Sequence, residues 1–340
     1  MLSVPHGPAA RAAPRSQLLS MPLEYVGKEG DQVARIRPQT PLENAQDEAR
    51  VFGGGLGDLW PFEARFLELD GAFLHYVDEG PRDAPVILCV HGNPTWSFQW
   101  REVITRLRGT HRVIALDHMG MGLSERPHDW ADSLVAHQAA LEALIDALEL
   151  DAITLAVHDW GGPIGLGVAA RRPERFRRFL ITNTCVWPEA QLPLTLALGR
   201  LPLLGPFLTG GLGLMNRLLA STTTTKGLPA EVEAGYMAPY ASAGRRRTVA
   251  SFVRAIPRGP GHENHAALAA VDASLPALRD KPTTIVWGMQ DWVFTPTILR
   301  GWRERMPRAE VRPQDDAGHL VMEDAGPEVL DALRDLLTRD

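Results

Sequence analysis

One short stretch constrains the fold of this chain more than any other. The apolar run Ile153–Val157 leads through His158 into Asp159, and the small residues Gly161 and Gly162 follow after Trp160. A strand that turns sharply into a helix exposes the residue at its tip, and small residues let such a turn pack closely. The tip residue here is an aspartate. Its carboxylate can attack a saturated carbon and form an ester that water must later cleave.

The composition is that of an ordinary globular protein. The 340 residues are 45% apolar, which is enough for a sizeable core, and 35 Lys+Arg against 41 Asp+Glu give a net charge of −6. The densest basic run, Arg245–Arg247, is interpreted as a solvated helix face, and we expect no nucleic-acid partner. No apolar run approaches a membrane span. Cys89 and Cys185 lie in or beside apolar runs and are predicted to be buried thiols, so the cytoplasm is the expected location.

The order of apolar runs predicts a sheet covered by helices. Residues 1–55 are rich in Pro, Ala, Arg and Gln and are predicted to be a poorly ordered N-terminal extension. Asp70 and Gly71 then mark a hairpin. From there short apolar runs alternate with helical patterns, which is typical of a mostly parallel sheet. The predicted strands are Val86–Val90, Val113–Leu116, Ile153–Val157, Phe179–Thr182, Thr284–Trp287 and Ala309–Arg312.

This alternation stops over residues 186–270, where helical pieces replace strands. These pieces are Leu192–Leu219, Glu231–Tyr240 and Arg245–Ile256. Open α/β sheets place their sites at the carboxyl ends of the strands, so a helical insertion here is predicted to be a cap over that edge. The core domain would then comprise residues 56–185 and 271–340.

A two-step displacement by Asp159 needs a base for the water and a carboxylate that orients the base. His319 follows the last predicted strand, and Asp291 follows the strand before it. The chain order of nucleophile, acid and histidine is that of the α/β-hydrolase fold. We therefore predict this fold, with a mostly parallel central sheet, flanking helices and an inserted helical cap. Asp315 and Asp316 are alternative acids, interpreted instead as turn or capping groups.

Two further loops are expected at the same edge of the sheet. The loop after the strand that precedes the insertion begins with Asn183 and has no carboxylate before Glu189, so it offers no rival acid. The loop after the first parallel strand contains Asn93. The backbone N–H groups of Asn93 and Trp160 would receive negative charge when water attacks the ester. Their side chains are donors that could hold a leaving anion, with core packing as the alternative role of Trp160.

These residues resemble the haloalkane dehalogenases, from about Trp60 to the C-terminus. The matching segments are His91–Arg101, Asp117–Ser124, His158–Gly162 and Asp316–His319. The resemblance implies hydrolytic release of halide from haloalkanes, with Asp159 as nucleophile, His319 as base and Asp291 as acid. It also implies that Asn93 and Trp160 bind the halide. In another branch of the family a second tryptophan does so, and Trp187, at the entrance of the cap, is the weaker candidate here.

The β-lactone decarboxylases of bacterial olefin biosynthesis are a second resemblance, through Tyr236–Gly259 and Trp287–Phe294. They share the aspartate, histidine and acid, so the substrate is predicted to be a small apolar molecule, either a haloalkane or a β-lactone. Epoxide hydrolysis is a third hypothesis, but its alkoxide needs acidic O–H donors. Tyr236 and Tyr240 are four residues apart and are interpreted as helix packing.

A non-enzymatic ligand receptor would have no need of a complete set of nucleophile, base and acid. No metal-ligand set or phosphate loop is visible in the sequence, so we expect neither a metal nor another cofactor. The oligomeric state is left open, and a homo-oligomer is compatible with the sequence.

Overall fold

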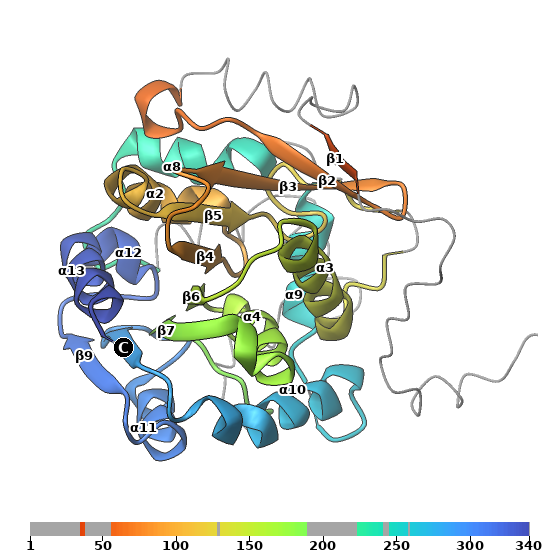
Figure 1. Ribbon diagram of the computed structural model, residues 1–340. Coiled ribbons are helices and arrows are strands. Elements are labelled where there is room, and N and C mark those ends of the chain that lie inside the picture. Colours follow the sequence, from red (N-terminus) through yellow and green to blue (C-terminus); the bar gives the residue numbers. More distant parts are fainter. Residues whose placement is uncertain are drawn as a thin grey trace, which may run out of the picture. The chain divides into compact units, whose positions relative to one another are not determined.

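A computed structural model describes residues 35–37, 56–127, 130–188, 223–240, 245–257 and 259–339. Its described strands form a nine-stranded sheet in the order β1-β2-β3-β5-β4-β6-β7-β8-β9 (Figure 1). The strands are β1 (Arg35–Arg37), β2 (Arg65–Leu69), β3 (Ala72–Glu79), β4 (Val86–Val90), β5 (Arg112–Leu116), β6 (Ile153–His158), β7 (Phe176–Thr182), β8 (Thr283–Gly288) and β9 (Glu310–Gln314).

The predicted hairpin and the mostly parallel sheet are both confirmed. β2 pairs antiparallel with β3 around Asp70 and Gly71, whose φ angles of 48° and 80° are those a tight turn needs. All pairs from β5 through β4, β6, β7 and β8 to β9 are parallel. Every residue of β6 and β8 is buried, because helices cover both faces of a parallel sheet.

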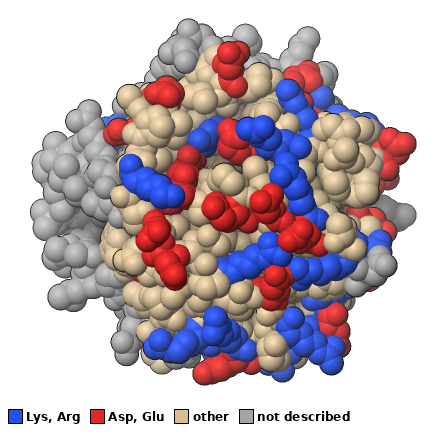
Figure 2. Space-filling model, turned by 90° about the vertical axis from the view of Figure 1, so that its left-hand side faces the viewer, with Lys and Arg blue, Asp and Glu red and all other residues tan. Residues whose placement is uncertain are grey.

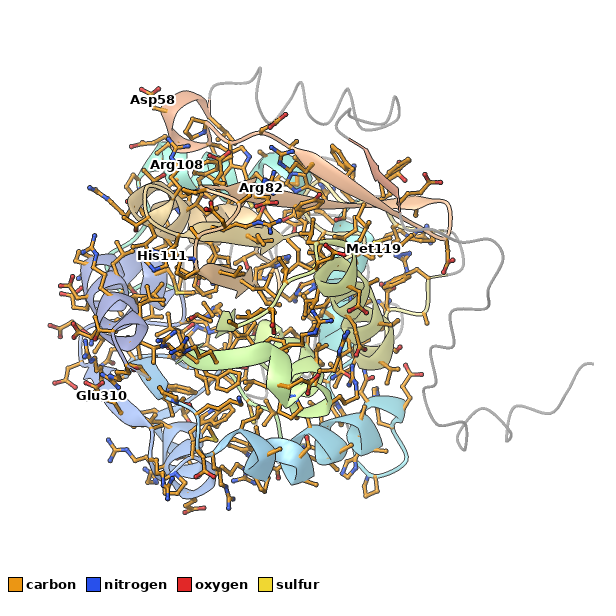
Figure 3. All side chains as sticks on the ribbon, in the orientation of Figure 1. Asp58, Arg82, Arg108, His111, Met119 and Glu310 are labelled. Carbon is orange, nitrogen blue, oxygen red and sulfur yellow. The ribbon has the colours of Figure 1, made fainter. Side chains whose placement is uncertain are left out.

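Helices lie on both faces of this sheet. In Figure 1, α2 and α13 lie on one side and α3, α4 and α10 on the other, and side chains fill the space between sheet and helices (Figure 3). The described α-helices are α2 (Arg101–Leu107), α3 (Leu134–Ala147), α4 (Gly161–Arg171), α8 (Ala230–Met237), α9 (Arg246–Arg254), α10 (Glu263–Ser274), α11 (Pro296–Arg305), α12 (Val321–Asp324) and α13 (Gly326–Leu337). Short 3-10 turns include η3 (Ser97–Trp100) and η6 (Ala238–Tyr240).

The chain between β7 and β8, here called the β7–β8 connection, is helical wherever the structure describes it as regular. α8, η6 and α9 occupy the two later predicted pieces, whereas the predicted helix over Leu192–Leu219 lies outside the described residues. α10 packs against α3 and α4 on the sheet, so the predicted boundary at residue 270 falls inside it. Of the predicted N-terminal extension, Arg35–Arg37 forms β1 and pairs with β2.

One basic run differs from its predicted role. Arg245 and Arg246 are half-buried and donate to the carbonyls of Ser124 and Tyr240 at 2.6 and 2.8 Å. Only Arg247 is exposed. The prediction of a solvated face was wrong for the first two because the helix lies against the core, and buried carbonyls need donors.

Surface charges of both signs are interspersed over the face shown in Figure 2. At β9 and α13, Arg312 bridges Glu310 and Asp335 at 2.8 and 2.7 Å. Neither cysteine forms a disulfide, and Cys89 is fully buried whereas Cys185 is half-buried. Among the helices of the described ranges, none combines the length and the apolar character that crossing a bilayer requires.

A buried ion pair fastens the β7–β8 connection to the core. Arg101 of α2 donates to both carboxylate oxygens of Glu323 in α12, at 2.6 and 2.8 Å, and both side chains are under 10% exposed. The Tyr236 hydroxyl of α8 donates to the same carboxylate at 2.5 Å. The Trp96 indole donates to the Gly235 carbonyl at 3.1 Å, beside these bonds.

Replacing Glu323 by alanine is expected to lower the free energy of unfolding by about 3–5 kcal/mol, because Arg101 would keep a buried charge without its partner. Chemical denaturation measures this change. Asp280→Ala, which removes an exposed carboxylate paired with Arg308, should leave stability nearly unchanged. Equal losses in the two variants would contradict the expected role of burial.

Candidate active site

Asp159 lies at a strained turn between β6 and α4. Its φ is 49°, a conformation that costs a non-glycine residue free energy and is concentrated at functional sites. The turn also needs glycine at positions 161 and 162, which follow Trp160. A Cβ at Gly161 would collide with the Val90 carbonyl, and one at Gly162 with the Thr184 hydroxyl. The local sequence thus places a carboxylate at the carboxyl edge of the sheet.

The two oxygens of the Asp159 carboxylate have different surroundings. Oδ1 accepts the Asn93 backbone N–H at 2.7 Å, and the Trp160 backbone N–H also stabilises the charged carboxylate. Oδ2 faces His319, whose Nε2 is 3.8 Å away, too far for a direct hydrogen bond. Burial raises the pKa of the Asp159 carboxyl, and His319 and the two N–H groups oppose that rise. Oδ1 is thus held by the Asn93 N–H, whereas Oδ2 faces the imidazole of His319.

The peptide group that supplies the Asn93 N–H is fixed by hydrogen bonds to its carbonyl, which belongs to Gly92. The Gly92 oxygen accepts from His91 Nδ1 at 2.7 Å and from the hydroxyl and backbone N–H of Thr95 at 3.0 and 3.1 Å. His118 fixes His91 in turn, since its backbone N–H donates to His91 Nε2 at 3.0 Å. Donors on the carbonyl of a peptide strengthen the N–H at its other end. The Asn93 N–H is therefore preorganised toward Asp159 Oδ1.

His319 lies in the loop between β9 and α12, where its ring bridges two carboxylates. Nδ1 bonds to Asp291 Oδ2 at 2.9 Å. Burial alone would lower the pKa of the imidazole, but the charges of Asp291 and Asp159 raise it above its ordinary value. The ring also contacts His158, with centroids 4.7 Å apart. Burial holds the pKa of His158 well below its ordinary value, so this neighbour stays neutral.

Asp291 follows β8, and its carboxylate is fully hydrogen-bonded. Oδ1 accepts the Val293 N–H at 2.7 Å, and Oδ2 accepts Asn183 Nδ2 at 2.8 Å as well as the bond from His319. Asp315 and Asp316 are exposed. Among the described residues, the structure thus brings Asp291 to His319 rather than either alternative acid.

Asn183 is a site residue that sequence reasoning missed. Its loop was considered only for a rival acid, yet its amide holds Asp291 and also exchanges two bonds with Gly288, at 2.8 and 3.1 Å. Asn183 is fully buried. The sequence did hold a signal: the apolar strand Phe179–Thr182 is followed directly by the polar amide of Asn183. The next strand along the chain is the one that Asp291 follows.

Trp160 and Trp187 have different surroundings. Trp160 is half-buried, and its indole meets Phe252 of α9 edge-on at 5.6 Å. Trp187 packs against Trp302 at 5.5 Å and lies under the Arg305 guanidinium at 4.0 Å. The side-chain oxygen of Asn93, next to Asp159, is buried and has no hydrogen-bond partner among the described residues.

The hydroxyls of both tyrosines in the described part of the β7–β8 connection are engaged with the protein. Tyr236 donates to Glu323. Tyr240 donates to the Thr95 carbonyl at 2.9 Å and accepts the Gly122 N–H at 3.3 Å. Neither hydroxyl is placed to protonate an epoxide oxygen, which agrees with the packing role expected for both. In the described part of the chain, no group of three or more His, Cys, Asp or Glu side chains is arranged to hold a metal ion.

Comparison with known proteins places the chain in a family. The family model of the alpha/beta hydrolase fold matches residues 85–326. The chain is 42% identical, over 83% of its length and 91% of the relative's, to a cis-3-alkyl-4-alkyloxetan-2-one decarboxylase of Shewanella oneidensis. It is 35% identical, over 81% of its length and 95% of the relative's, to haloalkane dehalogenase 2 of Mycobacterium tuberculosis.

A solved structure agrees with these relatives. The haloalkane dehalogenase DatA of Agrobacterium tumefaciens superposes with a TM-score of 0.74 at 26% identity, covering 84% of this chain and 98% of that one. The predicted fold class is therefore confirmed. The chain belongs to the α/β-hydrolase family, and its relatives include both haloalkane dehalogenases and cis-3-alkyl-4-alkyloxetan-2-one decarboxylases.

Proposed function

We propose that this chain is a hydrolytic haloalkane dehalogenase in which Asp159 Oδ2 attacks the carbon that carries the halogen. The carbon–oxygen bond forms as the carbon–halogen bond breaks, and the halide leaves with the bonding electrons. A halide is a weak base and needs hydrogen-bond donors rather than a proton. The Trp160 indole N–H and the Asn93 side-chain amide are the donors we assign to it.

Hydrolysis of the resulting ester completes the cycle. The 3.8 Å between His319 Nε2 and Asp159 Oδ2 exceeds a hydrogen bond and lets water approach between the imidazole and the ester. His319 takes a proton from this water, and Asp291 stabilises the imidazolium. The N–H groups of Asn93 and Trp160 stabilise the oxyanion on the former Asp159 carboxylate. The observation that carries the proposal is this unequal environment of the two Asp159 oxygens.

The β7–β8 connection is proposed to be the cap of this site. Phe252 of α9 contacts Trp160, and Tyr240 of η6 holds the loop that contains Asn93 through the Thr95 carbonyl. Apolar side chains in these positions would exclude bulk water, which strengthens the electrostatic interactions that stabilise the transition state.

Decarboxylation of a β-lactone is the second candidate, and the relative that is 42% identical supports it. Attack by Asp159 on the saturated ring carbon bonded to the ring oxygen would break that carbon–oxygen bond and release a carboxylate. Loss of carbon dioxide would then form the alkene and expel Asp159 as a carboxylate. No water is consumed, and the donors assigned to the halide would face the released carboxylate.

Turnover in heavy-oxygen water tests both candidates with one protein. We expect 1-bromobutane to yield bromide and to label the Asp159 carboxylate during repeated cycles, detected by peptide mass spectrometry. With a cis-disubstituted β-lactone, gas chromatography would detect an alkene and Asp159 would remain unlabelled. Alkene formation without bromide release would replace the first proposal by the second, and neither product would overturn both.

The rate of ester hydrolysis is expected to fall as the pH drops through the pKa of His319. Only the neutral imidazole accepts a proton from water, and the charge of Asp291 still raises the pKa of His319 when Asp159 is esterified and uncharged. Replacing Asp291 by asparagine removes the charge that raises this pKa, so the acidic limb of kcat should move to lower pH while its plateau falls. An unmoved limb would contradict the assignment of Asp291.

A further inference from the structure

Asp324 ends α12, and its buried carboxylate reaches back to the loop of His319. Oδ2 accepts the backbone N–H of Gly318, the residue directly before His319, at 2.7 Å. The same oxygen accepts the Thr225 N–H at 2.9 Å, and Oδ1 accepts the Lys226 N–H at 3.2 Å. Asp324 is 4% exposed, so donors that lost this partner would be left poorly solvated.

The residue after His319 is held by the same neighbouring segment. The Leu320 N–H donates to the Thr223 carbonyl at 3.0 Å, and the Thr225 hydroxyl donates to the Asp316 carbonyl. Gly318 packs so closely that a Cβ there would lie 2.6 Å from the Thr223 oxygen. The segment Thr223–Lys226, which leads into α8, therefore forms hydrogen bonds with the His319 loop both before and after the histidine.

We infer that Asp324 is a positioning residue that holds His319 at the distance ester hydrolysis requires. This inference rests on the proposed function of His319 as the base. Asp324 acts on the His319 loop through the Gly318 peptide and through the segment Thr223–Lys226, and it has no bond to Asp159 or to the Asn93 N–H among the contacts described. Its loss should consequently impair the step that uses His319 and spare the attack by Asp159.

Rapid-quench kinetics with 1-bromobutane, read by intact-protein mass spectrometry, separates the two steps. In Asp324→Ala, alkylation should stay within about threefold of wild type. Decay of the alkyl adduct should slow by roughly 10- to 100-fold, because a displacement of the base of about 1 Å costs that much. Asp324→Asn should be intermediate, since its amide oxygen can keep the two bonds at the Oδ2 position. Asp280→Ala removes an exposed carboxylate and should change neither rate.

A merely structural role would lower both rates together or leave adduct decay unchanged, and either outcome overturns the inference. If Asp324→Ala does not fold, Asp324→Asn decides the question by its ratio of alkylation to decay at an unchanged melting temperature. His319→Phe is measured in parallel. Adduct in that variant with normal decay in the Asp324 variants would sink this inference alone, whereas no adduct from 1-bromobutane would sink the proposed dehalogenase function and this inference with it.

Discussion

Replacing Asp159 by asparagine is expected to lower turnover of any accepted substrate by roughly 10⁴-fold or more. The amide is neutral and a poor nucleophile, so no ester can form on the enzyme. It keeps the shape of the side chain, and the Asn93 N–H that donates to Oδ1 at 2.7 Å can still meet an amide oxygen. Bromide release from 1-bromobutane and alkene release from a β-lactone measure the loss.

The matched control is Asp280→Asn, which exchanges the same atoms on an exposed side chain. Circular dichroism and thermal unfolding should show that both variants fold. A fully active Asp159→Asn protein, with deamidation back to aspartate excluded by mass spectrometry, would show that Asp159 is not the nucleophile. It would also contradict the proposed covalent displacement.

Replacing His319 by phenylalanine should stop catalysis after a single turnover while the first step proceeds. The ring shape that packs against His158 and Phe294 is kept, but no atom remains to accept a proton from water. Intact-protein mass spectrometry after mixing with 1-bromobutane should show one added butyl group, located on Asp159 by peptide mapping. The hydrolysis rate should fall by roughly 10³-fold or more, as with other groups that act as one catalytic unit.

His111→Phe is a suitable control, since its ring nitrogen bonds to the Thr110 hydroxyl at 2.8 Å, away from the site. This variant should turn over normally and hold no adduct. An adduct on a residue other than Asp159, or steady turnover by His319→Phe, would contradict the proposed division of labour between nucleophile and base.

The strands and the sharp turn could be predicted from local sequence. The run Ile153–Val157 became β6, and Asp159 stands at its tip because the neighbouring glycines allow the close approach to Val90 and Thr184. The packing of Arg245 could not be predicted. Whether a basic side chain on a helix faces water depends on what the helix covers, and here it covers a carbonyl of the Ser124 loop.

The site residues, like the fold, were predicted only in part from the sequence. Residue type and chain order alone named Asp159, Asp291 and His319, because a nucleophile, an acid and a base have few chemical forms and follow strands in a set order. The sequence also favoured Asp291 over Asp315 and Asp316, but the support that Asn183 gives to Asp291 was decided by the sheet. β7, β8 and β9 are neighbours, so side chains 28 and 108 positions apart meet at one carboxylate.

The sequence by itself determined which atoms are available for chemistry and the turn that presents one of them. Only the tertiary structure decided which partners support these groups: Asn183 holds Asp291, the Tyr236 hydroxyl donates to Glu323, and Asp324 holds the loop of His319. The physical reason is that hydrogen bonds reach about 3 Å, so their partners are set by the packing of distant segments rather than by local sequence.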